Sequence, residues 1–192
     1  MKELHFSNLC TMLERLSIKH FTDPPSVILD DFWRLLFLSH VDSFHFYNKF
    51  LAPSLDPRPC LHPVDLIKVC AGALSETQYH IYETLLYQVI SVINNSHIDF
   101  AYILQECLRT SDVKCKPQKL SLSYVTDFLA NFYSLSDIDR TKAFKDLFHS
   151  CTPIEVKWVM RLLCKSMRLT LTDEEIIMKW HKFSVFDSFE PL

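Results

Sequence analysis

Four basic residues recur at helical spacing in the last third of the chain: Lys157, Arg161, Lys165 and Arg168. On an α-helix, which turns by about 100° per residue, they fall within about 80° of arc, on one narrow face. A row of cations can contact the phosphate backbone of a nucleic acid, which positions a protein without reading sequence. The same row can also be the solvated edge of a buried helix, paired with acidic neighbours, because exposed Lys and Arg are ordinary. Spacing alone leaves both interpretations open.

The residues around the four cations predict the helix that carries them. Thr152 and Glu155 have the spacing of a capping box, and Pro153 stands at the first helical position, where its missing N–H costs nothing. Apolar side chains fill most of the remaining surface, so we expect this helix to lie at the centre of a bundle. These apolar residues are Trp158, Met160, Leu162, Leu163, Cys164, Met167 and Leu169.

The first half of the chain also has helical periodicity. Apolar residues recur at three- and four-residue steps over 6–16, and an aromatic-rich helix is expected over 26–50, with its aromatic side chains packed in the core. Prolines at 53, 57, 59 and 63 mark a loop after it. Asp65 is expected to cap a short helix through Ala73, and Ser75 is expected to cap the next helix.

The second half of the chain has clearer signals for where helices begin. A helix is expected over about 97–108, and the polar, basic segment 111–119 is expected to be a loop or linker. Further helix starts are predicted at Ser121 or Ser123, at Ser136, and at a second capping box, Thr172–Glu175. The chain is therefore predicted to be all-α, with roughly eight to ten helices. We expect one helical domain over 1–192, or two subdomains at 1–110 and 118–192.

Composition excludes several classes of function. The 192 residues are 48% hydrophobic, enough for a sizeable core, and the formal net charge is −3, so nucleic-acid binding would need a local basic patch. A single glycine, Gly72, cannot build a phosphate loop, a dinucleotide fingerprint or a glycine-based nucleophile elbow. Few glycines also argue against a hairpin-rich β fold.

Cysteine and histidine usage indicates an intracellular protein without a metal site. The seven cysteines are odd in number and form no C-x-x-C pair, so we expect reduced thiols. The nine histidines are scattered and form no H-E-x-x-H motif, and no nucleophile can be paired with a base from sequence alone. The N-terminus lacks the apolar core of a signal peptide, and no apolar run reaches membrane-spanning length.

The segment Glu155–Leu169 resembles the N-terminal helical domain of ATP-dependent DNA ligases, most closely that of DNA ligase IV, the ligase of non-homologous end joining. The family pattern has an acidic residue, then Lys-Trp, an Arg three residues later, a Lys four beyond that, and a basic-Leu-Gly ending. Seven residues fall in this register without gaps: Glu155, Lys157, Trp158, Arg161, Lys165, Arg168 and Leu169. Ile176 and His181 continue the register, and the likeness is good over about Asp99–His181.

The resemblance implies an all-helical domain that wraps nicked or broken DNA through minor-groove and phosphate contacts, and that also docks proteins. Lys157, Arg161, Lys165 and Arg168 would then contact the DNA backbone or form structural ion pairs, with Lys157 structural because it adjoins Trp158. The implied partners are duplex DNA and double-strand-break repair proteins in the nucleus. No cofactor, metal, membrane or small-molecule substrate is implied.

Two departures from the family pattern lead to two hypotheses. Thr170 stands where the family has glycine, and its β-branch resists the left-handed turn that glycine permits, which weakens the case for DNA contact there. The nucleotidyl-transfer lysine of ligases lies in a Lys-x-Asp-Gly motif. The single glycine here, Gly72, follows Ala71 and not an aspartate, so the sequence has no such motif. We therefore expect a non-catalytic DNA-binding module of double-strand-break repair. The alternative is an interaction scaffold that keeps the fold, lacks DNA binding, and holds a repair protein in an apolar groove.

Overall fold

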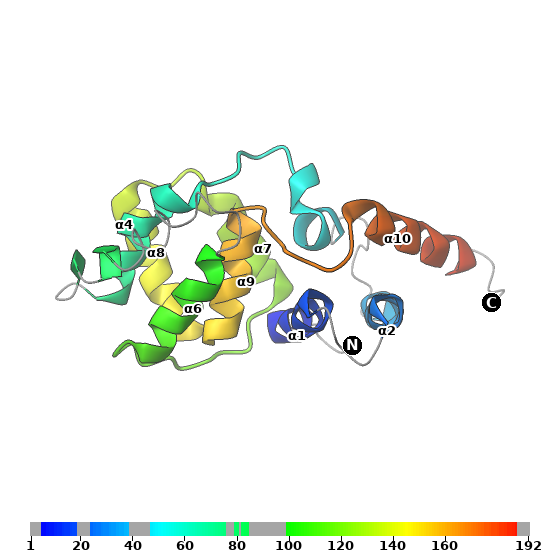
Figure 1. Ribbon diagram of the computed structural model, residues 1–192, viewed down its shortest axis with the longest axis horizontal. Coiled ribbons are helices and arrows are strands. Elements are labelled where there is room, and N and C mark those ends of the chain that lie inside the picture. Colours follow the sequence, from blue (N-terminus) through cyan, green and yellow to red (C-terminus); the bar gives the residue numbers. More distant parts are fainter. Residues whose placement is uncertain are drawn as a thin grey trace. The chain divides into compact units, whose positions relative to one another are not determined.

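The computed structural model describes residues 5–18, 24–38, 47–75, 79–80, 82–84 and 99–187. These residues form ten helical elements and no strand, which confirms the prediction of an all-α protein (Figure 1). Within the same ranges, no helix is both long enough and apolar enough to cross a membrane. The chain divides into two compact units, Met1–Pro57 with Met167–Leu192, and Arg58–Ser166. The units interleave along the sequence, and the predicted domain boundaries stay a prediction.

The first unit contains α1 (Phe6–Ser17), α2 (Pro25–Leu38), the π-helical turn η1 (Tyr47–Leu51), the 3₁₀ turn η2 (Pro53–Leu55) and α10 (Asp173–Asp187). Helix α2 packs against both α1 and α10. The apolar stripe predicted for α1 is buried, because Phe6, Leu9, Leu13 and Leu16 are each fully inaccessible to solvent.

The aromatic-rich helix expected over 26–50 falls within the described residues only in part. Helix α2 ends at Leu38, and a separate π-helical turn begins at Tyr47; residues 39–46 lie outside the described part. Three of the aromatic residues in the described part, Phe32, Trp33 and Phe50, are buried, as the core-packing interpretation expects.

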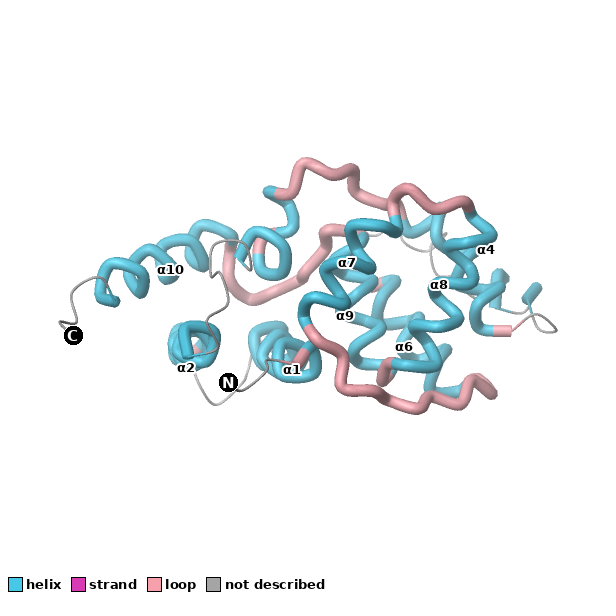
Figure 2. The backbone as a smooth tube through the Cα atoms, turned by 180° about the vertical axis from the view of Figure 1, so that it is seen from behind, coloured by secondary structure: helices cyan, strands magenta, loops and turns pink. Residues whose placement is uncertain are grey.

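The second unit is a helical bundle of α4 (Pro63–Leu74), α6 (Phe100–Thr110), α7 (Leu122–Phe132), α8 (Asp137–Ser150) and α9 (Pro153–Leu163) (Figure 2). Helix α9 contacts α6, α7 and α8, while α4 packs against α8 and α6. Gly72 of α4 allows a close approach to α8, because a Cβ at this position would stand only 3.1 Å from Thr141 Cγ2.

Most of the predicted helix starts are confirmed, because capping is a local interaction. The side chains of Ser121 and Ser136 accept hydrogen bonds from the backbone N–H groups of Tyr124 and Asp139, and α7 and α8 begin at the next residues. The second capping box is also present: Thr172 N–H donates to the Glu175 carboxylate at 2.8 Å.

The predicted cap at Asp65 is wrong. Helix α4 begins two residues earlier, at Pro63, and the His62 side chain accepts the hydrogen bond of Val64 N–H at 3.3 Å. Proline at the first helical position sets the start, which leaves Asp65 in the first turn. Ser75 ends this helix, and much of the helix expected after it lies outside the described residues. All seven cysteines are free thiols, as expected.

Candidate nucleic-acid interface

Helix α9 begins with the capping box that the sequence predicts. Thr152 Oγ1 accepts a hydrogen bond from Glu155 N–H at 3.3 Å, and Glu155 Oε2 accepts one from Thr152 N–H at 2.8 Å. The Thr152 hydroxyl also donates to Glu155 Oε2 at 2.9 Å. Two of the unsatisfied N–H groups at the start of the helix therefore have partners, and the carboxylate lies at the positive end of the helix dipole.

Every residue of α9 from Glu155 to Leu163 is buried, including two of the four candidate cations. Lys157 is 5% exposed and Arg161 is 7% exposed. The prediction that this helix lies at the centre of its bundle is confirmed. A cation this inaccessible needs a partner within the protein, because burying an unpaired charge is costly.

Arg161 is held between an acid and an aromatic ring. Its Nε donates to Asp99 Oδ2 at 3.1 Å, its Nη2 donates to the same oxygen, and its guanidinium carbon stands 4.5 Å from the centre of the Trp158 ring. The second oxygen, Asp99 Oδ1, accepts the hydrogen bond of Ala101 N–H at 3.1 Å and so caps α6. One carboxylate thus caps α6 and pairs with α9. Lys157 Nζ lies 5.3 Å from the same ring.

The C-terminal end of α9 is closed by a Schellman motif. Ser166 N–H donates to the Arg161 carbonyl at 2.9 Å, and Lys165 N–H donates to the Leu162 carbonyl at 3.2 Å. Lys165 occupies the left-handed position of this motif, with a φ of 48°. Glycine usually fills that position, because it has no Cβ to clash with the backbone.

A distant segment completes this helix end. Leu61 N–H donates to the Leu163 carbonyl at 3.2 Å, and the Cys60 thiol lies 3.0 Å from the Cys164 carbonyl oxygen. Lys165 Nζ donates to the carbonyl oxygen of Arg58. Lys165 is partly buried, and its ammonium lies at the negative end of the helix dipole, where a cation is stabilising.

Arg168 and Thr170 belong to the first unit, where they lead into α10. Arg168 is exposed and has a φ of 51°, so the left-handed residues of this stretch are Lys165 and Arg168. Thr170 is not left-handed: its N–H and its hydroxyl both donate to the Leu16 carbonyl, at 2.9 and 2.7 Å. The position where the ligase pattern has glycine is therefore used to join the segment to α1.

The expectation that the four cations share one helix face is wrong, because α9 ends at Leu163. Lys157 and Arg161 lie on the helix and are buried, Lys165 caps its end, and Arg168 lies beyond it in the other unit. Their assignment as DNA-binding residues stays a prediction. Asp99 and the Arg58 carbonyl were not identified as partners from sequence. Only Asp99 carried a signal, as a capping residue before an apolar helix.

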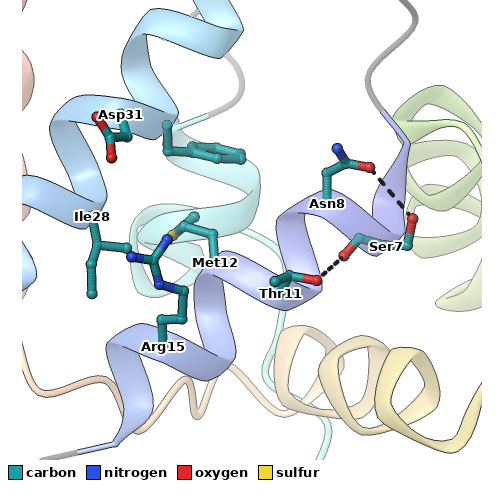
Figure 3. Close-up of a pocket in the computed structure, with 8 residues that line it drawn as sticks. Ser7, Asn8, Thr11, Met12, Arg15, Ile28 and Asp31 are labelled. Carbon is teal, nitrogen blue, oxygen red and sulfur yellow. Dashed lines mark hydrogen bonds between the residues drawn. The ribbon is translucent and has the colours of Figure 1, made fainter. Parts of the chain in front are cut away.

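A shallow hollow of about 350 Å³ lies between α1 and α2 in the first unit (Figure 3). Its apolar lining consists of Met12, Ile28 and Phe32, all of which are at most 4% exposed. Arg15 and Asp31 lie in the lining, together with short polar side chains of α1. The hollow therefore combines polar side chains with apolar side chains that are themselves largely buried.

The second unit is an all-helical bundle built around a buried Lys-Trp-x-x-Arg helix. Residues 5–181 match the family described as the DNA ligase N terminus. The chain belongs to this family, and this membership supports its identification as a DNA-binding ligase domain. The resemblance noted in the sequence is thereby confirmed at the level of the family. A search of curated proteins finds no match to the chain.

Proposed function

We propose that this chain is a non-catalytic DNA-binding module of double-strand-break repair, similar to the N-terminal domain of DNA ligase IV and acting in non-homologous end joining in the nucleus. The observation that carries the proposal is the family match over residues 5–181. The ungapped register of Glu155–Leu169 supports the assignment to the ligase IV branch. Duplex DNA and double-strand-break repair proteins are the proposed partners.

The decisive experiment is a salt titration of duplex binding by the full 192-residue chain, followed by fluorescence anisotropy of a labelled nicked duplex. Phosphate-driven binding predicts that log K falls linearly with log salt, with a slope of about −0.9 for each phosphate contact. If no binding appears even at about 50 mM salt, DNA binding is refuted. Arg168→Gln is expected to lower the slope by about 1 if this exposed side chain contacts a phosphate.

The non-catalytic part of the proposal has its own test. The only glycine of the printed sequence, Gly72, is not part of a Lys-x-Asp-Gly motif, so no lysine is set up for nucleotidyl transfer. Incubation with ATP labelled in the adenylate is expected to leave the protein unlabelled. A covalent adenylate that survives denaturation would overturn this part and leave DNA binding untouched.

The second candidate is an interaction scaffold that keeps the ligase-domain fold without binding DNA. The net charge of −3 supports this function, as does Thr170, which bonds Leu16 where the ligase pattern has glycine. It ranks second because the apolar side chains of the hollow are already buried, which leaves little surface for an apolar partner. Absence of duplex binding in the salt titration would favour the scaffold.

A further inference from the structure

Outside the α9 region, exposed basic residues of the second unit lie on two segments that hydrogen bonds hold side by side. One segment is the extended stretch between α6 and α7, and the other is α8. We call the following set the lysine surface: Lys114, Lys116, Lys119, Lys142, Lys145 and His149. All six side chains are exposed.

The extended stretch is fixed to the end of α8 by backbone hydrogen bonds. Lys116 N–H donates to the His149 carbonyl at 2.7 Å, and Gln118 N–H donates to the Ser150 carbonyl at 2.9 Å. His149 Nδ1 lies 3.2 Å from the carbonyl oxygen of Lys114, which can only accept, so the ring nitrogen donates. The segment predicted as a loop or linker is therefore held in place beside the helix.

The α8 residues of the surface form a row that leads to this stretch. At 100° per residue, Lys142, Lys145 and His149 fall within about 60° of arc on one side of the helix. Lys145 lies one turn before His149, so their side chains are neighbours. Hydrogen bonding then makes His149 the junction between the row on α8 and the lysines of the extended stretch.

Attraction to the helix dipole accounts for only part of this arrangement. The negative end of a helix dipole stabilises cations within the last turn. For α8, this effect reaches only His149 and the lysines of the extended stretch beside it. Lys142 and Lys145 stand earlier in α8, which runs from Asp137 to Ser150, and gain nothing from that end. The lysine surface holds five lysines with three exposed aspartates near it in sequence, Asp112, Asp139 and Asp146, so it is locally positive in a chain whose net charge is −3.

The dimensions suit a polyanion with closely spaced charges. An extended stretch from Lys114 to Lys119 spans at most about 17 Å, and Lys142 to His149 rises about 10 Å along the helix. Duplex DNA carries one charge per about 1.7 Å of its axis, so a length of about 17 Å presents about ten phosphate charges. Lysines on a fixed scaffold can neutralise several of these without base recognition.

We infer that the lysine surface is a binding site for the phosphate backbone of duplex DNA, separate from the α9 end. The inference rests on the proposed DNA-binding function and assigns its main electrostatic contact to residues that the ligase pattern does not include. Each lysine that contacts a phosphate contributes about 0.9 to the salt slope, and the site carries no sequence preference.

The test compares duplex salt slopes for the wild type and the triple variant Lys116→Gln, Lys119→Gln, Lys145→Gln. The slope is expected to become shallower by about 2.7 in the triple variant. The matched control is Lys68→Gln, which removes an exposed lysine from α4 and is expected to leave the slope unchanged. If the wild type binds with a steep slope and the triple variant keeps it, the lysine surface is refuted while DNA binding stands. If the wild type does not bind at all, both proposals fall.

Lysine footprinting gives a second readout on the unaltered chain, which stays informative if the triple variant folds poorly. The protein is acetylated with and without duplex, and modification is measured by mass spectrometry. Duplex is expected to protect Lys114, Lys116, Lys119 and Lys145 at least threefold more than Lys68, with protection lost at high salt. Equal protection at Lys68 and at the lysine surface would overturn the assignment.

Discussion

The buried pair of Arg161 and Asp99 yields a quantitative prediction for the variant Arg161→Gln. The substitution removes the cation from a pair whose side chains are only 9% and 16% exposed. Breaking a buried pair by removing one partner costs about 3–5 kcal/mol, and losing a desolvated cation–π contact with Trp158 removes up to about 2 kcal/mol. Asp99 keeps the Ala101 N–H donor and some access to water, which lowers the cost. We expect the free energy of unfolding to fall by about 2–4 kcal/mol.

Urea unfolding followed by circular dichroism measures this change. With a slope of about 2 kcal/mol per molar urea, the midpoint should fall by about 1–2 M. The matched control is Arg109→Gln on α6, which breaks an exposed ion pair with Glu106 at 2.8 Å and should cost less than about 1 kcal/mol. Asp99→Asn keeps a capping oxygen, so a double-mutant cycle with Arg161→Gln isolates the pair, with an expected coupling of about 1–3 kcal/mol.

Two results would refute this account of Arg161. A loss of stability no greater than that of Arg109→Gln, or a coupling to Asp99 near zero, would show that the pair does not support the fold. At a temperature where Arg161→Gln is folded, its duplex affinity should lie within about twofold of the wild type, because the guanidinium is buried. A tenfold loss of affinity in a folded variant would return Arg161 to the DNA interface.

Three further predictions concern single positions. Gly72→Val should lower stability by about 1–3 kcal/mol in urea unfolding, and Thr141→Ala in the same chain should restore part of it, because a Cβ at 72 would stand 3.1 Å from Thr141. Thr170→Val removes the hydroxyl bond to Leu16 and should cost about 1 kcal/mol, whereas a gain in stability would contradict its role. Burial raises the pKa of Cys164 to about 12 from an ordinary 9.0, so the unfolded chain loses a proton that the folded chain keeps. Stability should therefore fall as pH rises from 9.0 towards 12, and Cys164→Ala should reduce that slope in alkaline unfolding.

Helix starts were predictable from sequence because their determinants lie within four residues. The capping box at Thr152 and the caps at Ser121 and Ser136 each needed only a hydroxyl followed by N–H groups of the same segment. The end of α9 was not predictable in this way. A lysine fills its left-handed position, and the last carbonyls are bonded by a segment about a hundred residues earlier, around Leu61. Without that contact in view, the apolar pattern through Leu169 reads as a longer helix.

Local and distant determinants also distinguish the cations of α9 from those of the lysine surface. Lys157 and Arg161 stand one helical turn apart in the ligase-like segment, and the fold buries both beside Trp158. Regular spacing on an otherwise apolar helix thus indicates a structural role, because such a helix is surrounded by others. The lysine surface draws on two segments that hydrogen bonds at His149 bring together, so no single period runs through all of its residues. A phosphate backbone needs accessible charge. The lysine surface meets this need, and the ligase pattern does not include its residues.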